Sequence, residues 1–184
     1  MKQQLVLTVI GPDRPGLVRA IAHEVVSAGG DWLESRMATL AGTFAGVVLV
    51  AVPHERADAL GARLQALQSQ GLRVGVEVGS ADPLPVSGRL LQLELLGQDR
   101  PGIVREVTHL LAERQVSVEE LETDTISGAF SGETLFRARA RLRVPAALPT
   151  EALRGLLEDL ANELMVDVNL EEPEHTAPAA GVPR

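Results

Sequence analysis

A four-residue motif, D-R-P-G, occurs twice in the chain, each time between an apolar run and a segment of helical periodicity. The first copy lies in GPDRPGLVRAIAH, which begins at Gly11, and the second in GQDRPGIVREVTH, which begins at Gly97. An aspartate and a proline just before a first helical turn are typical of a helix cap. The following glycine costs roughly 1 kcal/mol inside a helix, so we expect it to let something approach the backbone closely.

The chemistry of this motif suits a small zwitterion. Free N–H groups and the positive dipole end of a helix N-terminus attract a carboxylate, which Gly16 or Gly102 would allow to come close. Asp13 or Asp99 would attract an ammonium group. The motif therefore predicts an amino-acid site, and a compact turn that only caps the helix explains the same residues equally well.

The motif belongs to a longer internal repeat that fills the chain. Residues 11–24 align with residues 97–110, with identities at Gly11, Asp13, Arg14, Pro15, Gly16, Val18, Arg19 and His23. Further along, the alignment places Gly42, Phe44 and Gly46 on Gly128, Phe130 and Gly132, and several extra residues follow in the second copy. Two copies of one structural unit are therefore expected.

Each copy has the pattern β-α-β-β-α-β. In the first copy we predict strands at 4–10, 31–40, 46–52 and 72–78 and helices at 14–30 and 55–71; in the second, strands at 89–97, 116–126, 133–144 and 165–171 and helices at 100–115 and 149–164. Right-handed crossovers then give a ferredoxin-like α+β fold with both helices on one face of an antiparallel sheet. We expect domains at 1–79 and 89–171, a linker at 80–88 and a disordered tail at 172–184.

The composition of the chain argues against several classes of function. The chain has 184 residues, no cysteine, and 17 basic against 25 acidic residues, which gives a net charge of −8. This charge and an aromatic content of 2% argue against direct nucleic-acid binding. We expect no targeting leader, no membrane span and a cytoplasmic location. We also expect no enzyme activity, no cofactor and no metal site, because His23 and His109 fit solvated helix faces better than a ligand set.

The two copies differ on the helix-free face of the sheet. In LFRARARLRV, the side chains of Arg137, Arg139, Arg141 and Arg143 share one face, and we expect them to pair across strands with Glu120, Glu122, Asp124 and Glu94. The strands of the first copy are apolar on both sides, so we expect its open sheet face to be apolar and covered by another protein surface.

The repeat and its D-R-P-G motifs resemble the ACT domain, a small regulatory module that commonly binds amino acids. Two such units with little else resemble the glycine cleavage system transcriptional repressor family. The resemblance implies a ligand site near the interface with another ACT unit, built from the first loop and the end of the first helix. Carried over by position, the site residues are Gly11, Asp13, Arg14, Pro15, Gly16 and Asp31, and Gly97, Asp99, Arg100, Pro101, Gly102 and Ser117.

The resemblance also implies partners. It suggests binding of glycine or a similar small amino acid, homo-oligomers through ACT pairing, and repression through a DNA-binding activator without direct contact to DNA. Two alternatives stay open: an orphan amino-acid-binding regulatory subunit of a biosynthetic enzyme, and an interaction module in which D-R-P-G is only a cap.

Overall fold

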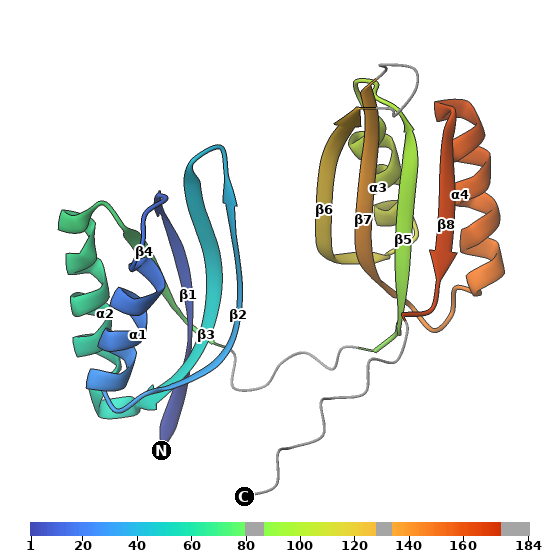
Figure 1. The fold of residues 1–184 in the computed structure, drawn as a ribbon. Coiled ribbons are helices and arrows are strands. Elements are labelled where there is room, and N and C mark those ends of the chain that lie inside the picture. Colours follow the sequence, from blue (N-terminus) through green and yellow to red (C-terminus); the bar gives the residue numbers. More distant parts are fainter. Residues whose placement is uncertain (80–86, 128–133, 174–184) are drawn as a thin grey trace, which may run out of the picture. The chain divides into compact units, whose positions relative to one another are not determined.

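The computed structural model describes residues 1–79, 87–127 and 134–173. The chain divides into two compact units, residues 1–84 and 85–184, and each is described by itself (Figure 1). The expected linker at 80–88 lies largely outside the described residues, as does most of the expected tail at 172–184. The domain boundaries thus remain predictions.

The first unit has the predicted β-α-β-β-α-β order. Its elements are β1 (Lys2–Pro12), α1 (Leu17–Ser27), β2 (Asp31–Leu40), β3 (Thr43–Pro53), α2 (Ala57–Ala66) and β4 (Arg73–Val78), with 3-10 turns η1 (His54–Arg56) and η2 (Leu67–Gln70) flanking α2. The strands form one antiparallel sheet in the order β2-β3-β1-β4. This order follows from two β-α-β crossovers that place β1 in the centre beside β3.

The second unit repeats this architecture. Its elements are β5 (Arg89–Gln98), α3 (Ile103–Glu113), β6 (Ser117–Ser127), β7 (Thr134–Val144), α4 (Thr150–Leu164) and β8 (Val166–Glu171). The sheet order is β6-β7-β5-β8, again antiparallel throughout. The predicted α+β class with two ferredoxin-like units is confirmed.

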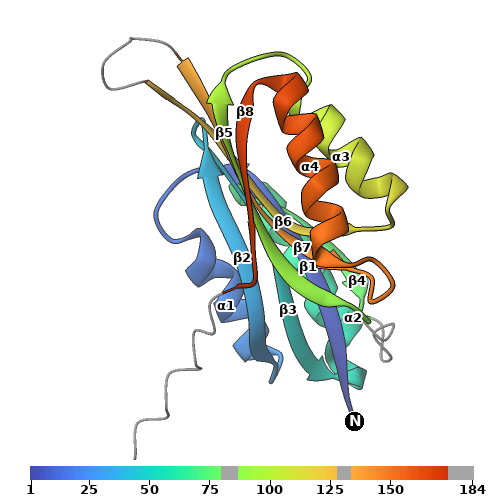
Figure 2. The ribbon, with the colours of Figure 1, turned by 90° about the vertical axis from the view of Figure 1, so that its right-hand side faces the viewer.

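In each unit the core lies between the helices and one face of the sheet. Figure 1 shows α1 beside α2, and Figure 2 shows α3 beside α4 on one side of their sheet. The helices bury residues at four-residue spacing, Leu17, Ile21 and Val25 in α1 and Ile103, Val107 and Leu111 in α3. Alternate residues of the central strands meet them, so the opposite face of each sheet carries no helix of its own unit.

The strand register corrects one part of the repeat alignment. Gly11 pairs with Phe44 in the first unit, and Gly97 pairs with Phe136 in the second. Phe136 is therefore the counterpart of Phe44, and the alignment of Phe44 with Phe130 is wrong. The extra residues of the second copy lie at 128–133, between β6 and β7, rather than after Gly132; Gly128, Phe130 and Gly132 themselves fall outside the described residues.

Candidate functional site

The D-R-P-G motif forms the connection between the first strand and the first helix of each unit. Gly16 and Gly102 occupy the N-cap positions of α1 and α3 with φ angles of 95° and 102°. Residues with a Cβ rarely adopt this left-handed conformation, so the glycine is explained by the backbone itself. The glycine lies at the N-cap, whereas the sequence-based argument had placed it inside the helix, where it would cost stability.

The aspartates do not cap these helices, so the predicted capping role of Asp13 and Asp99 is wrong, while a compact turn without a ligand stays open. Neither helix has a side-chain hydrogen bond at its N-cap. Instead, the backbone N–H of Asp13 donates to the carbonyl oxygen of Gly42 over 2.8 Å, and that of Asp99 donates to Thr134 over 3.1 Å. Both carboxylates are exposed, and within the described residues neither forms a hydrogen bond or ion pair. They are therefore available to a ligand.

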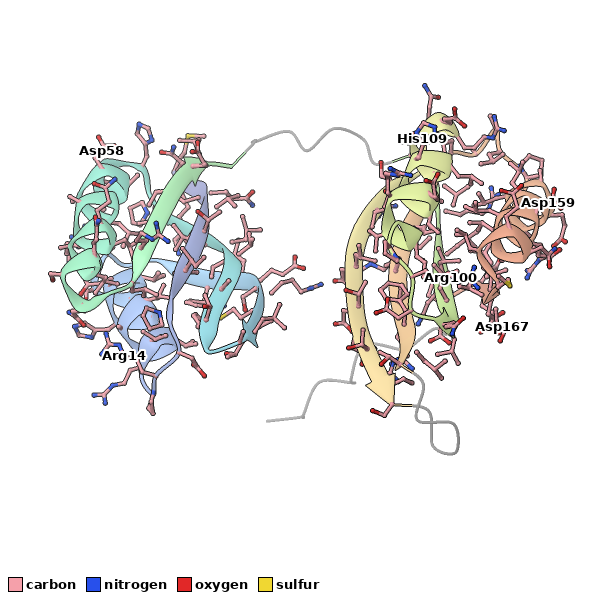
Figure 3. All side chains as sticks on the ribbon, turned by 90° about the horizontal axis from the view of Figure 1, so that it is seen from above. Arg14, Asp58, Arg100, His109, Asp159 and Asp167 are labelled. Carbon is pink, nitrogen blue, oxygen red and sulfur yellow. The ribbon has the colours of Figure 1, made fainter. Side chains whose placement is uncertain are left out.

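The arginines of the two motifs tie the loop to the end of the second helix (Figure 3). Nη2 of Arg14 donates to the carbonyl oxygen of Gln70 over 2.6 Å, and Nη2 of Arg100 lies 3.5 Å from the Sδ atom of Met165. A structural role in holding the loop accounts for these contacts without any ligand.

The glycines that precede the motifs allow close backbone contact. A Cβ at Gly11 would lie 2.6 Å from the carbonyl oxygen of Gly71, and one at Gly97 would lie 2.7 Å from Cα of Val166. By contrast, nothing lies within 4 Å of a Cβ built on Gly16 or Gly102. Space for a ligand is therefore present over the helix N-terminus, beside exposed Pro15 and Pro101, and not over the preceding strand.

Asp31 and Ser117 lie far from the motifs of their own units. Asp31 pairs with Ala51 on β3, whereas Gly11 pairs with Phe44. Seven residues of extended strand span about 23 Å. The same separation holds in the second unit, where Ser117 pairs with Arg143 and Gly97 with Phe136. A single unit thus does not bring the two halves of the predicted site together, and Asp31 already forms an ion pair with Lys2.

The predicted pairing of charges on β7 is confirmed, with one change of partner. Nε of Arg139 lies 2.9 Å from Oε1 of Glu94, and Arg137 forms a bidentate pair with Asp124. The hydrogen bond from Arg137 lowers the pKa of the Asp124 carboxyl below its usual value. Arg141 lies 2.9 Å from Glu120. These arginines are thus bound to carboxylates of their own sheet.

Glu119 is the partner that the sequence pattern missed. It lies within the register shift between Val118 and Glu120, and it contacts both Arg141, at 3.3 Å, and Arg143, at 2.5 Å. A strict alternation assigns Glu119 to the other face, and a bulge is what reverses that assignment.

The open face of the first sheet is apolar in the centre and charged at the edges. Ile10 and Val47 are 40% and 48% exposed, and Leu49 is half-buried. On the edge strand β2, Glu34 and Arg36 form an ion pair at 3.0 Å. Cover of this face by another protein surface stays a prediction.

Other candidate groups do not gather into a site. His23 is exposed, and Nε2 of His109 lies 3.5 Å from Glu113. Among the described residues, histidine, aspartate and glutamate side chains form no group of three that could hold a metal ion. In the same residues, no helix is long and apolar enough to cross a membrane.

Comparison with known families agrees with the fold. Models of the ACT domain match residues 3–78 and residues 91–161. The chain therefore belongs to the ACT domain family and carries two ACT domains in tandem.

Some proteins resemble this chain over most of its length, across both ACT domains. The chain is 24% identical over 166 residues to the glycine cleavage system transcriptional repressor of Escherichia coli K12, covering 90% of this chain and 85% of the relative. The Shigella flexneri repressor matches equally. A solved structure of an unknown protein from Galdieria sulphuraria has a TM-score of 0.82 and 32% identity over 94% of this chain and 99% of its own. The chain is thus a tandem ACT protein that resembles a regulator of glycine cleavage.

Proposed function

We propose that the chain is an amino-acid-responsive regulatory protein that acts through protein contacts and not by catalysis. The observation that carries this proposal is the pair of D-R-P-G loops, each with an uncapped helix N-terminus, an exposed aspartate and open space over its glycine. The tandem ACT architecture supports it, and so does the similarity to a transcriptional repressor.

The ligand we propose is a small amino acid, glycine or one of similar size. Its carboxylate would accept from the free N–H groups of the first turn of α1 or α3, where the helix dipole also favours a negative charge. Its ammonium group would face Asp13 or Asp99. Gly16 and Gly102 give the carboxylate access because no side chain lies over them.

A complete site needs a second ACT unit. Asp31 and Ser117 are about 23 Å from the motif of their own unit by strand geometry, so they can join a D-R-P-G site only if they come from another unit. A ligand held between two units stabilises their association by the amount that it binds the paired state better. We therefore propose that the ligand regulates through homo-oligomer assembly.

The regulatory target is proposed to be a DNA-binding activator of glycine cleavage genes, reached by protein contact in the cytoplasm. The similarity to the Escherichia coli repressor supports this target, and the net charge of −8 disfavours direct contact with DNA. The alternative is an orphan regulatory subunit of a biosynthetic enzyme, which the same fold and ligand chemistry would serve.

Isothermal titration with a panel of amino acids, glycine and serine first, tests the ligand site. We expect binding that Asp13→Ala or Asp99→Ala weakens by at least tenfold, which corresponds to about 1.4 kcal/mol. Gly16→Val and Gly102→Val should also weaken binding, and circular dichroism must show that the chain stays folded, because a valine is strained at these φ angles. Normal binding by both glycine variants would contradict a site at the helix N-terminus.

Transcription and assembly test the rest of the proposal. Deleting the gene should raise glycine cleavage transcripts in the absence of added glycine, and purified protein should leave the mobility of the promoter DNA unchanged. Unaltered transcripts would favour the biosynthetic alternative. Light scattering with and without glycine should report an oligomer, whereas a monomer with the open face of β1 and β3 in solvent would contradict cover of that face.

A further inference from the structure

The helix-free face of the first sheet has an apolar patch at its centre. Its members are Val6 and Ile10 of β1 and Val47 and Leu49 of β3, which neighbour one another in the strand register. They project away from the helices, because Leu7, between the two β1 members, is buried on the helix side. All four side chains are half-buried or exposed in their own unit, so cover by another apolar surface would release water from them.

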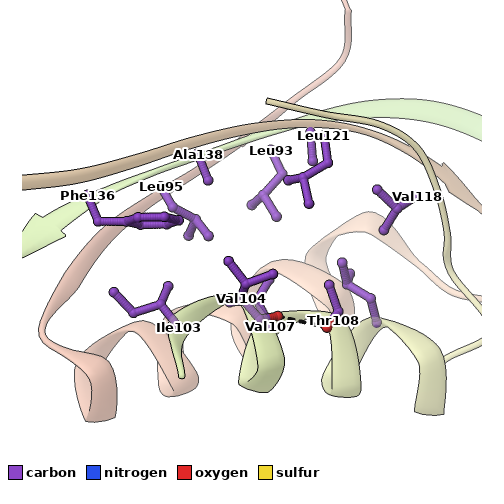
Figure 4. Close-up of a pocket in the computed structure, with 12 residues that line it drawn as sticks. Leu93, Leu95, Ile103, Val104, Val107, Thr108, Val118, Leu121, Phe136 and Ala138 are labelled. Atoms are coloured by element: carbon purple, nitrogen blue, oxygen red, sulfur yellow. Dashed lines mark hydrogen bonds between the residues drawn. The ribbon is translucent and has the colours of Figure 1, made fainter. Parts of the chain in front are cut away.

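The open face of the second unit is a poor match for this patch. Figure 4 shows Phe136 and Ala138 of β7 pointing toward α3, which leaves Arg137 and Arg139 on the opposite face. Their carboxylate partners lie on that same face and are exposed. Apolar cover would take these ion pairs out of water, which is unfavourable. Another apolar patch matches better, and a second copy of the chain supplies one.

Two charges border the patch on the edge strand β4. In the strand register, Arg73 pairs with Ile10 and Glu77 pairs with Val6, so one charge lies at each end of the patch. Both side chains are exposed, and within the described residues neither forms a hydrogen bond or an ion pair. Four residues of extended strand place the two about 14 Å apart. Each charge is therefore available to a partner on another molecule.

A twofold axis makes this face complementary to itself. Packed sheets lie about 10 Å apart with their strands nearly aligned. An axis in the interface, perpendicular to the strands at the level of Val47, places Ile10 of each copy over Val6 of the other. The same rotation places Arg73 of each copy over Glu77 of the other. Apolar side chains thus meet in the centre, and two pairs of opposite charges meet at the β4 edge.

The β2 edge of the face is compatible with the same arrangement. The rotation places Arg36, which pairs with Val47 in the register, over Arg36 of the second copy. In each chain this arginine already forms an ion pair with Glu34 at 3.0 Å. Each cation thus brings its own carboxylate, so the pairing is selected by the patch and by the β4 charges.

We propose that the apolar patch, with Arg73 and Glu77, binds the same surface of a second copy and forms a twofold dimer through the first unit. The proposal rests on the cover of this face that the proposed function expects, and it names the occupant. None of the D-R-P-G residues belongs to the patch, so the dimer forms without an amino acid. Four strands give a small interface, and we expect a dissociation constant on the order of 10 μM.

Sedimentation equilibrium of the full chain without amino acids measures this dimer. Val47→Asp puts a carboxylate on the twofold axis and should raise the dissociation constant at least a hundredfold, with circular dichroism to show that the chain stays folded. The matched control is Val26→Asp, on the exposed surface of α1, which should leave the constant unchanged. A chain that is monomeric at 100 μM, or a dimer that Val47→Asp leaves intact, would overturn the proposal.

Exchange of the two β4 charges tests the arrangement itself. Arg73→Glu and Glu77→Arg each bring like charges together across the axis and should weaken the dimer about tenfold. The double variant restores opposite pairs and should return to within about threefold of the original constant, a rescue that damage to the fold does not produce. Single variants without effect, or a double variant as weak as the single ones, would refute this pairing.

The amino-acid site is tested separately, by titration of glycine into the same samples. A chain that binds glycine but stays monomeric would overturn the dimer and leave the proposed ligand site standing. A dimer that follows the charge exchange but binds no amino acid would support the pairing and contradict the ligand site.

Discussion

The two units share one backbone register and carry opposite chemistry on the open faces of their sheets. On β3 the side chains facing away from the helices are small or apolar, and at the corresponding positions of β7 every one is arginine: Ala45, Val47, Leu49 and Ala51 against Arg137, Arg139, Arg141 and Arg143. The helix side shows no such reversal, since Phe44 and Phe136 are both buried at the same register position. The fold depends on the helix side, so the open faces are free to serve different contacts.

The loop that carries D-R-P-G is common to both units, and its strongest structural demand lies at Gly11 and Gly97, two residues before the exposed aspartates. Gly11→Ala and Gly97→Ala each place a Cβ within 2.7 Å of backbone. Backbone cannot yield as a flexible side chain does, so we expect a loss of about 3 kcal/mol in the unfolding free energy of the altered unit. Urea denaturation of the full chain, followed by signals from each unit, measures the loss.

The matched controls for this prediction are Gly61→Ala in α2 and Gly155→Ala in α4. Nothing lies within 4 Å of a Cβ at either position, and alanine favours a helix over glycine by about 1 kcal/mol. Both controls should therefore stabilise their units. Unchanged stability with alanine at Gly11 or Gly97 would show that β4 or β8 can move away. It would contradict the claim that the loop requires glycine at these two positions.

The two units differ in the residue that ends their second helix. Gly71 ends η2 with φ at 82°, whereas Met165 ends α4 with φ at 54°. Since a methionine is strained there and its side chain is 62% exposed, Met165→Gly should stabilise the second unit by about 0.5–1 kcal/mol, and Gly71→Ala should destabilise the first by a similar amount. A thermal melt of each variant checks the two signs. Destabilisation by Met165→Gly would mean that the contact of Met165 with Arg100 outweighs the strain.

The fold and the charged face of the second unit could be predicted from the sequence because both depend on local periodicity. Helical spacing from Leu17 to Val25 and alternation from Arg137 to Arg143 are visible in the letters alone. The cap role of Asp13 could not be judged in this way, since it depends on where its side-chain oxygens point relative to the free N–H groups of the first turn.

The charged face should also make the units respond differently to acid. The Arg137 hydrogen bond keeps the pKa of the Asp124 carboxyl below its usual value in the folded state. The ion pair therefore stabilises the second unit while Asp124 is ionised, and this stabilisation is lost as the pH falls through the lowered pKa. Asp124→Asn should therefore lower the stability of the second unit at pH 7 and narrow the difference between pH 7 and pH 3. The effect should be small and should shrink with added salt, because the pair is exposed.

Denaturant melts at the two pH values test this prediction, with Asp159→Asn as the control for loss of an exposed carboxylate outside the charged face. The first unit should show the same melt in both variants. A loss in Asp124→Asn that persists unchanged in high salt would point to packing and not to charge.

The smallest expected change in stability belongs to the residues expected to matter most for ligand binding. Asp13 and Asp99 cap nothing, and within the described residues their carboxylates are unpaired, so Asp13→Ala and Asp99→Ala should alter the unfolding free energy by less than about 0.5 kcal/mol. A true cap would lose about 1 kcal/mol. Equilibrium unfolding without amino acids separates the two cases. Near-zero changes in both units, together with lost amino-acid binding, would leave ligand recognition as the role of these aspartates, and a cap-sized loss in either unit would restore the structural explanation there.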